Sequence, residues 1–117
     1  MYLIVYCCYV AIPPPPNPPT VSEKDPTSVI VEIDVPPTNV TVTIICSIKY
    51  KKKGDPKWLE VQVPDCQSVI IHHLQQGSTY IFKVVLKYKG QTTGSESKPK
   101  EIHIKDRKCF IKLLNAL

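Results

Sequence analysis

Few side chains in this sequence are arranged for catalysis. The three histidines are His72, His73 and His103, and two of them are adjacent. Neighbouring residues of a strand point to opposite faces, so His72 and His73 are not expected to work as a pair. The chain has four glycines, and it contains no nucleophile elbow, no paired carboxylates in a cleft-forming context and no phosphate-binding glycine loop. We therefore predict no enzyme activity, no catalytic residue and no cofactor.

Cysteine is the other residue type that could form a site. Five are present, an odd number that cannot pair completely within the chain: Cys7, Cys8, Cys46, Cys66 and Cys109. None has the paired Cys/His spacing of a tetrahedral zinc site, so we predict no metal. For Cys46 and Cys66 two alternatives stay open, either buried free thiols or a disulfide that only an oxidising compartment would preserve.

Charge and modification signals favour binding over chemistry. Fifteen Lys and Arg against ten Asp and Glu give a formal net charge of +5, which biases the chain towards acidic partners. Asn39-Val40-Thr41 is an N-glycosylation sequon between two predicted strands, where a secreted domain would expose its acceptor. Such triplets also occur by chance, so Asn39 favours an extracellular location only modestly.

The elements that would position these residues are strands. Alternating apolar and polar residues predict strands at 28–33, 42–51, 58–63, 68–74, 80–88 and 101–105. In the clearest one, Tyr80, Phe82, Val84 and Leu86 share a face. Turn signals recur about every 8 to 12 residues and no sustained helical period appears, so we predict two packed antiparallel sheets.

The two ends are predicted to lie outside this domain. Residues 1–12 are apolar and too few to span a bilayer as a helix, and so is the run from Cys109 to Leu117. Six of the seven residues from Pro13 to Pro19 are proline, which predicts a polyproline II spacer, with an SH3-type ligand as the less favoured alternative. We expect an N-terminal segment and polyproline linker at 1–17, a domain at 18–105 and a tail at 106–117.

Several motifs together resemble the fibronectin type III family. The strongest is Leu74-x-x-Gly77-x-x-Tyr80, which is similar to the corner that leads into the sixth strand of that family. Weaker matches are Pro18-Pro19, Cys46-x-Ile48-x-Tyr50 and Trp58; departures are Gln76 in place of proline and Ile33 in place of a core tryptophan. The resemblance implies a seven-stranded antiparallel immunoglobulin-like sandwich, in which the Tyr80 hydroxyl reaches a backbone group.

The resemblance also implies a basic surface. If the strands at 42–51, 80–88 and 101–105 share one sheet, five lysines project from its outer face: Lys49, Lys51, Lys83, Lys87 and Lys105. Such a face could bind a sulfated glycan or an acidic protein, although the favoured alternative is that the lysines only keep the sheet soluble. We expect no nucleic acid, since no aromatic residue interleaves with these lysines to stack bases.

The sequence thus favours a non-catalytic protein-interaction or spacer module of a larger adhesion- or receptor-type protein. Its expected location is extracellular or at the cell surface, with a membrane link only through a parent protein. The alternatives are a cytoplasmic appendage of an intracellular scaffold or immune protein, or a module that binds sulfated glycans. A Trp-Ser-x-Trp-Ser box and an Arg-Gly-Asp tripeptide are both absent from the sequence.

Overall fold

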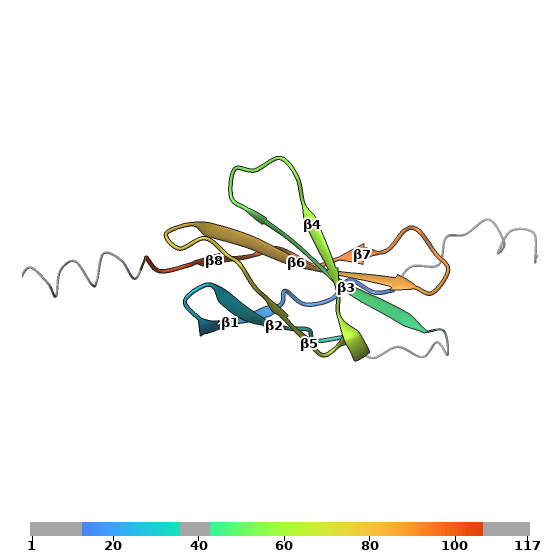
Figure 1. Ribbon diagram of the computed structural model, residues 1–117. Helices are drawn as coiled ribbons and strands as arrows, with labels where there is room; N and C mark the ends of the chain where they lie inside the picture. The colour runs from blue at the N-terminus through green and yellow to red at the C-terminus, as the bar shows by residue number, and fades with distance from the viewer. Residues whose placement is uncertain (1–12, 36–42, 107–117) are drawn as a thin grey trace, which may run out of the picture.

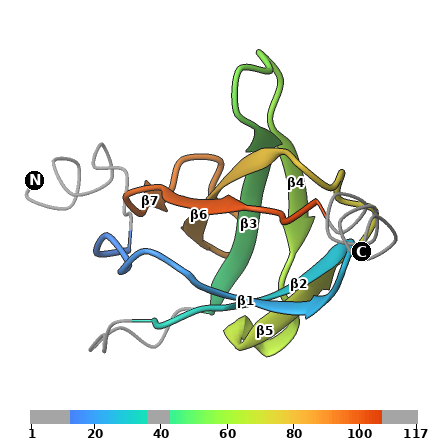
Figure 2. The same cartoon turned by 90° about the vertical axis from the view of Figure 1, so that its left-hand side faces the viewer.

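The computed structural model describes residues 13–35 and 43–106, and this part of the chain is an all-β sandwich (Figures 1 and 2). A three-stranded sheet has the order β1-β2-β5, and in the five-stranded sheet β4 pairs with β3, β3 with β6, and β6 with both β7 and β8. All pairs are antiparallel, which confirms the predicted fold class. The elements are β1 Thr20–Asp25, β2 Ser28–Glu32, β3 Ile44–Lys52, β4 Leu59–Gln62, the 3-10 helix η1 Pro64–Cys66, β5 Ser68–Ile71, β6 Thr79–Tyr88, β7 Ser95–Glu96 and β8 Lys100–His103.

The described residues contain eight strands, one more than the seven expected. The strand predicted at 101–105 is β8, and the short strand β7, which was not predicted, precedes it; both pair with β6. Between β7 and β8 lies Pro99, which has no amide hydrogen for a sheet ladder. β1 had no alternating signal of its own, because its sequence TVSEKD is almost wholly exposed. Within the part described, no helix is long and apolar enough to cross a membrane.

β5 is shorter than predicted and stops at Ile71. His73 has a positive φ of 62°, a left-handed backbone conformation that is incompatible with an extended strand. His72 and His73 therefore lie beyond the strand, so the prediction that they occupy opposite faces of a strand was wrong. Their ring centroids are 6.1 Å apart.

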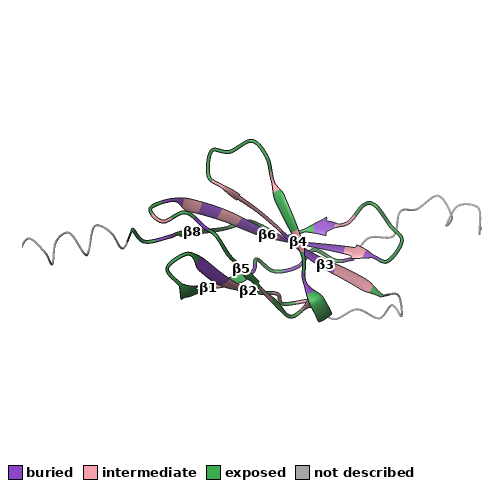
Figure 3. Cartoon of the chain, viewed as in Figure 1, coloured by how far each residue is buried: buried purple, intermediate pink, exposed green. Residues whose placement is uncertain are grey.

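The core lies between the sheets and follows the alternation of β6 (Figure 3). Tyr80, Phe82, Val84 and Leu86 are buried on the inner face, while Lys83 and Lys87 on the other face are half-buried. Ile33, in the position where the family resemblance implies tryptophan, is half-buried against this cluster. Full burial of each aliphatic side chain stabilises the fold by about 1.5–3 kcal/mol. The buried cluster consists of Val29, Val31, Cys46, Ile48, Val63, Ile71, Leu74, Tyr80, Phe82, Val84, Leu86 and Ile104.

The proline-rich segment packs against the sandwich by one of its three ridges. Pro13, Pro16 and Pro19 are buried and the other prolines of the segment are exposed, a spacing of three that matches polyproline II. The Ser95 hydroxyl donates a hydrogen bond to the Pro13 carbonyl oxygen, and the Asn17 amide donates to Asp34 at 3.0 Å. The segment expected to be a free linker thus contacts the domain from Pro13 onwards. The domain bounds themselves stay a prediction.

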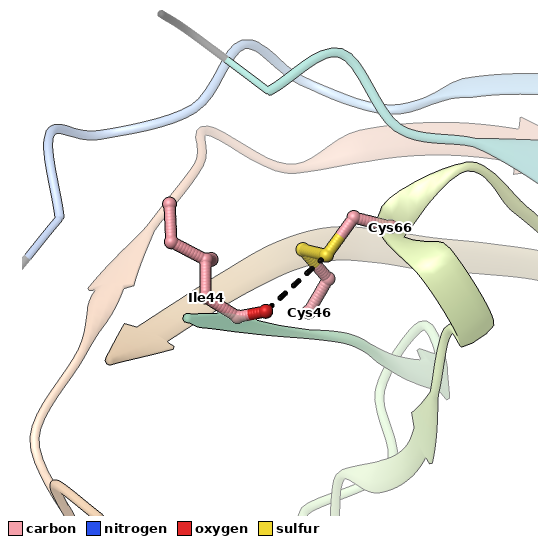
Figure 4. The surroundings of a disulfide bond; sticks show 3 residues. All are labelled: Ile44, Cys46 and Cys66. Carbon is pink, nitrogen blue, oxygen red and sulfur yellow. Dashed lines mark hydrogen bonds between the residues drawn. A yellow bond between two sulfur atoms is a disulfide. The ribbon is translucent and has the colours of Figure 1, made fainter. Parts of the chain in front are cut away.

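A disulfide joins Cys46 on β3 to Cys66 at the end of η1 (Figure 4). The two Cα atoms are 5.2 Å apart, and the bonded residues are separated by 20 positions in the sequence. β3 belongs to the five-stranded sheet and η1 leads directly into β5 of the other sheet. The bond therefore ties the two layers together and decides between the two alternatives left open for these cysteines.

The segment from Leu74 to Tyr80 closes the connection between β5 and β6. The Tyr80 hydroxyl accepts a hydrogen bond from the Gln75 amide at 2.8 Å, and the Gly77 amide donates to the Ile104 carbonyl at 2.7 Å. Gly77 has a φ of +79°, which a side-chain-free residue adopts without strain. Leu74 is buried in the core. The connection is therefore tied to the start of β6, to the residue after β8 and to the core.

Replacing Tyr80 by phenylalanine removes the acceptor for the Gln75 amide and keeps the ring. We expect the free energy of unfolding to fall by about 1–2 kcal/mol, measured by urea denaturation. Tyr50→Phe is the matched control, since the structure records no hydrogen bond for the half-buried Tyr50 hydroxyl. Equal losses in both variants would show that the corner hydrogen bond contributes nothing.

Reducing the disulfide is expected to destabilise the domain without unfolding it. Opening the cross-link between positions 20 apart should lower the free energy of unfolding by about 3 kcal/mol. The measurement compares thermal unfolding with and without reductant. The variant Cys46→Ala with Cys66→Ala should not respond to reductant, which separates this bond from the chain's other cysteines. Identical curves for the natural protein in both buffers would contradict the pairing.

Candidate functional site

Lysines gather on the outer face of the five-stranded sheet, where β3 pairs with β6. Lys49 lies directly opposite Lys83, and Lys51 lies two pairs further along, opposite Ile81. Because the even-numbered residues of β6 are buried between the sheets, these odd-numbered positions project outward. We call Lys49, Lys51 and Lys83 the basic face.

Glu96 of β7 neutralises much of this face. Its carboxylate forms ion pairs with two ammonium groups, Oε1 with Lys83 Nζ at 2.7 Å and Oε2 with Lys49 Nζ at 3.2 Å. The hydrogen bond from Lys83, aided by Lys49, lowers the pKa of Glu96 below its ordinary value of 4.5. Like charges directly opposite each other in a sheet are destabilising, and the shared carboxylate offsets that repulsion. Two of the three lysines therefore carry charge that is already paired.

Trp58 covers the other side of the basic face. The Lys51 ammonium lies 4.7 Å and the Lys83 ammonium 4.4 Å from the centroid of its ring. A cation at this distance is attracted by the negative face of the indole. The expectation that no aromatic residue lies among the lysines was therefore wrong. The ring is engaged by ammonium groups, and the absence of a nucleic-acid partner stays a prediction.

The remaining predicted lysines lie elsewhere. Lys87 is on the same face of β6 but near the end of the strand, opposite Ile45. Lys105 follows β8 and lines a small cavity with Glu23 and Asp25 of β1. Lys105 is therefore not part of the basic face. Of the five predicted positions, the structure brings Lys49, Lys51 and Lys83 together.

Two residues of this network were missed by the sequence analysis. Glu96 reaches the lysines only because β7 pairs with β6 at Val85, a contact across eleven residues of chain. Trp58 was assigned to the start of a strand, and its contact with Lys83 depends on the order of strands in the sheet. Glu96 lies outside the strand predicted at 101–105, so no local pattern placed it beside the lysines.

A groove opens at the end of the sandwich beside the β3–β4 loop. This loop projects away from both sheets (Figures 1 and 2). The groove has a volume of about 510 Å³. One wall comes from the end of β3, the loop and the start of β4; the other comes from the connection between β5 and β6. Its lining residues are Tyr50, Lys51, Lys52, Asp55, Lys57, Leu59, His72, His73, Leu74, Gln75 and Tyr80.

Other predicted features give no site among the described residues. No group of three or more His, Cys, Asp or Glu side chains in residues 13–35 and 43–106 is placed to hold a metal ion. His103 shares a hydrogen bond of 3.0 Å with the Thr79 hydroxyl, and His72 shares one of 3.1 Å with the Ser28 hydroxyl. Asn39 of the sequon lies outside the described residues, as do Cys7, Cys8 and Cys109.

Comparison with known proteins identifies related domains. A family model for the fibronectin type III domain matches residues 14–103. A structure titled "Myokine structure" is 22% identical, with a TM-score of 0.67, and the match covers 80% of this chain and 99% of that chain. A solution structure of the sixth fibronectin type III domain from human fibronectin type III domain containing protein 3 is 20% identical, with a TM-score of 0.68 and coverage of 85% and 92%.

Longer chains contain the same fold as one part. The FN1-FN3 domains of chicken CNTN1 match at 17% identity with a TM-score of 0.68, over 83% of this chain and 34% of that chain. A titin crystal structure matches at 21% identity with a TM-score of 0.67, over 81% and 33%. A search of curated proteins found no match. At these identities the structural likeness establishes the fold.

Glu96→Gln tests whether the shared carboxylate stabilises the basic face. The pKa of Glu96 is lowered in the folded state, so its contribution is present above the unfolded pKa and is lost as pH falls through the folded pKa. Because the side chain is 40% exposed, we expect the variant to be only about 0.5–1 kcal/mol less stable near pH ~6 and nearly equal near pH ~3.

Glu32→Gln on β2, in the other sheet, makes the same change of charge away from the basic face. Urea denaturation of both variants across this pH range separates a specific ion pair from a general charge effect. A stability difference for Glu96→Gln that does not change with pH would rule out the ion pairs as its cause.

Proposed function

Because this chain belongs to the fibronectin type III family, we propose that it is a non-catalytic module of a larger adhesion- or receptor-type protein, outside the cell or at its surface. Domains of this family typically mediate protein interactions or act as spacers in larger proteins. The sandwich supports that role, because it holds surface loops on a rigid core. Proteins of unrelated function share the fold, so location and partner must be argued from particular residues.

The Cys46–Cys66 disulfide is the observation that carries the proposed location. Such bonds form and persist in oxidising compartments and are rare in the cytosol, where thiols are kept reduced. The Asn39 sequon adds support of the same kind, since an acceptor for N-glycosylation is useful only in the secretory pathway. A cytoplasmic appendage of the same fold would leave both features unused.

Sulfated-glycan binding by the predicted lysines has less support. Lys49 and Lys83 are paired with Glu96, and Lys105 lies away from the basic face, beside a small cavity that β1 also lines. A polyanion would have to displace Glu96 to use the centre of the basic face. These ion pairs fit the alternative in which the lysines keep an exposed sheet soluble and its strands in register.

The test is to express the natural gene with its own flanking sequence in cultured eukaryotic cells and isolate the protein. We expect Cys46 and Cys66 to be found linked by peptide mapping after alkylation, and Asn39 to carry a glycan that a glycosidase removes. Glycosidase treatment should increase the electrophoretic mobility of the natural protein. Asn39→Gln should abolish this increase, whereas Asn17→Gln, which lies outside any sequon, should not. Recovery of an unglycosylated protein with free Cys46 and Cys66 thiols would support the cytoplasmic alternative instead.

A further inference from the structure

We propose that the groove beside the β3–β4 loop binds a short acidic peptide segment that carries an apolar side chain. This inference rests on the proposed function as a protein-interaction module and specifies the charge and the apolar content of the partner segment. Three features of the groove carry it: an apolar floor that the sandwich leaves uncovered, a basic rim, and a wall held in an unusual backbone conformation.

The floor is apolar because the two sheets do not end together. Tyr50 and Leu59 are paired across β3 and β4, so their side chains lie on the same face, the one turned towards the other sheet. That sheet ends with β5 at Ile71 and cannot cover them. Leu59 remains 50% exposed and Tyr50 half-buried. An apolar side chain inserted here would bury surface that the fold itself leaves in water.

The rim is basic. Lys52 and Lys57 line the groove against one carboxylate, that of Asp55, while the ammonium of Lys51 lies over Trp58 on the outer face. Lys52 spans the opening with a hydrogen bond of 2.6 Å to the Gln75 side chain, so its ammonium is held at the mouth. Lys57 is exposed on the loop. This arrangement complements a peptide that presents carboxylates on either side of its apolar residue.

The opposite wall is built from His72 and His73. His73 adopts a φ of 62°, which is uncommon for a residue with a side chain and is maintained only where surrounding contacts impose it. His72 is anchored by its hydrogen bond to Ser28. Both rings line the groove, and an imidazole N–H can donate a hydrogen bond to a peptide carboxylate or carbonyl. The wall thus offers polar contacts in addition to the lysine charges.

The apolar floor favours a peptide over a sulfated glycan. A glycan would satisfy the lysines but has no side chain to cover Leu59 and Tyr50. Leu59 and Ile70 are the two large hydrophobic residues exposed in the described part of the chain, and of the two Leu59 lines this groove. Charge and apolar surface therefore meet at this place.

The experiment is an NMR titration of the whole chain with a defined hexapeptide of two glutamates, leucine, phenylalanine and two glutamates. We expect saturable shifts of amide signals around Lys57, Leu59 and His73 as the peptide is raised to millimolar concentration. Two altered peptides separate the contributions: one replaces leucine and phenylalanine by serine, the other replaces every glutamate by glutamine. Each should bind more weakly than the parent peptide.

Matched variants locate the site on the protein. Leu59→Ser and Lys57→Glu should each weaken peptide binding about tenfold. Ile70→Ser, which alters the other exposed aliphatic residue, and Lys24→Glu, on β1 of the other sheet, should leave it unchanged. Circular dichroism checks that each variant is folded.

Three outcomes would overturn the proposal: no saturable shift, shifts that map to another face, or equal effects of Leu59→Ser and Ile70→Ser. A heparin-derived octasaccharide is titrated in parallel. The groove is a glycan site, and the peptide proposal fails, if the natural protein binds the octasaccharide but not the peptide and Lys57→Glu abolishes octasaccharide binding. The proposed location is tested separately, by glycosylation of Asn39 and by the Cys46–Cys66 linkage. Failure of the peptide proposal can therefore be told apart from failure of the proposed location.

Discussion

The pairing of β3 with β6 is the contact on which the rest of the structure depends. It runs in register from Ile44 opposite Tyr88 to Lys52 opposite Tyr80. Its inner face contributes Cys46, Ile48, Phe82, Val84 and Leu86 to the core, and every other strand of the five-stranded sheet joins one of these two. A shift of one residue would exchange the buried face with the lysine face. Core packing and surface charge are therefore set by one register.

Two connections hold the second layer onto this pair. The disulfide links β3 to the chain just before β5, and the corner at Leu74–Tyr80 links the chain just after β5 to the start of β6. Both ends of β5 are thus fixed to the central strands. The β5–β6 connection that results is also one wall of the groove, so the contacts that stabilise the sandwich position the candidate binding surface.

Charge on this surface is more balanced than the net charge of +5 suggests. Glu96 pairs with two lysines, Glu101 pairs with Lys53 at 2.9 Å, and Trp58 engages two ammonium groups. The outer face of the sheet is therefore largely occupied by its own contacts. The groove differs, because its lysines outnumber its carboxylate and its apolar floor is open to solvent. That contrast is why the two surfaces lead to different expectations for binding.

The sequence by itself determined the all-β class, the family and the facing of the strongest strands. Alternation along Tyr80–Leu86 and the Leu74-x-x-Gly77-x-x-Tyr80 motif are local patterns, and local patterns are readable because strand geometry has a period of two. β1, the end of β5 at Ile71 and the pairing of Cys46 with Cys66 were not readable in this way. Only the tertiary structure decided that Glu96 and Trp58 join Lys83 and that Leu59 borders a groove. These contacts depend on which strands become neighbours and where each sheet ends, and a strand's own sequence does not encode the identity of its neighbour.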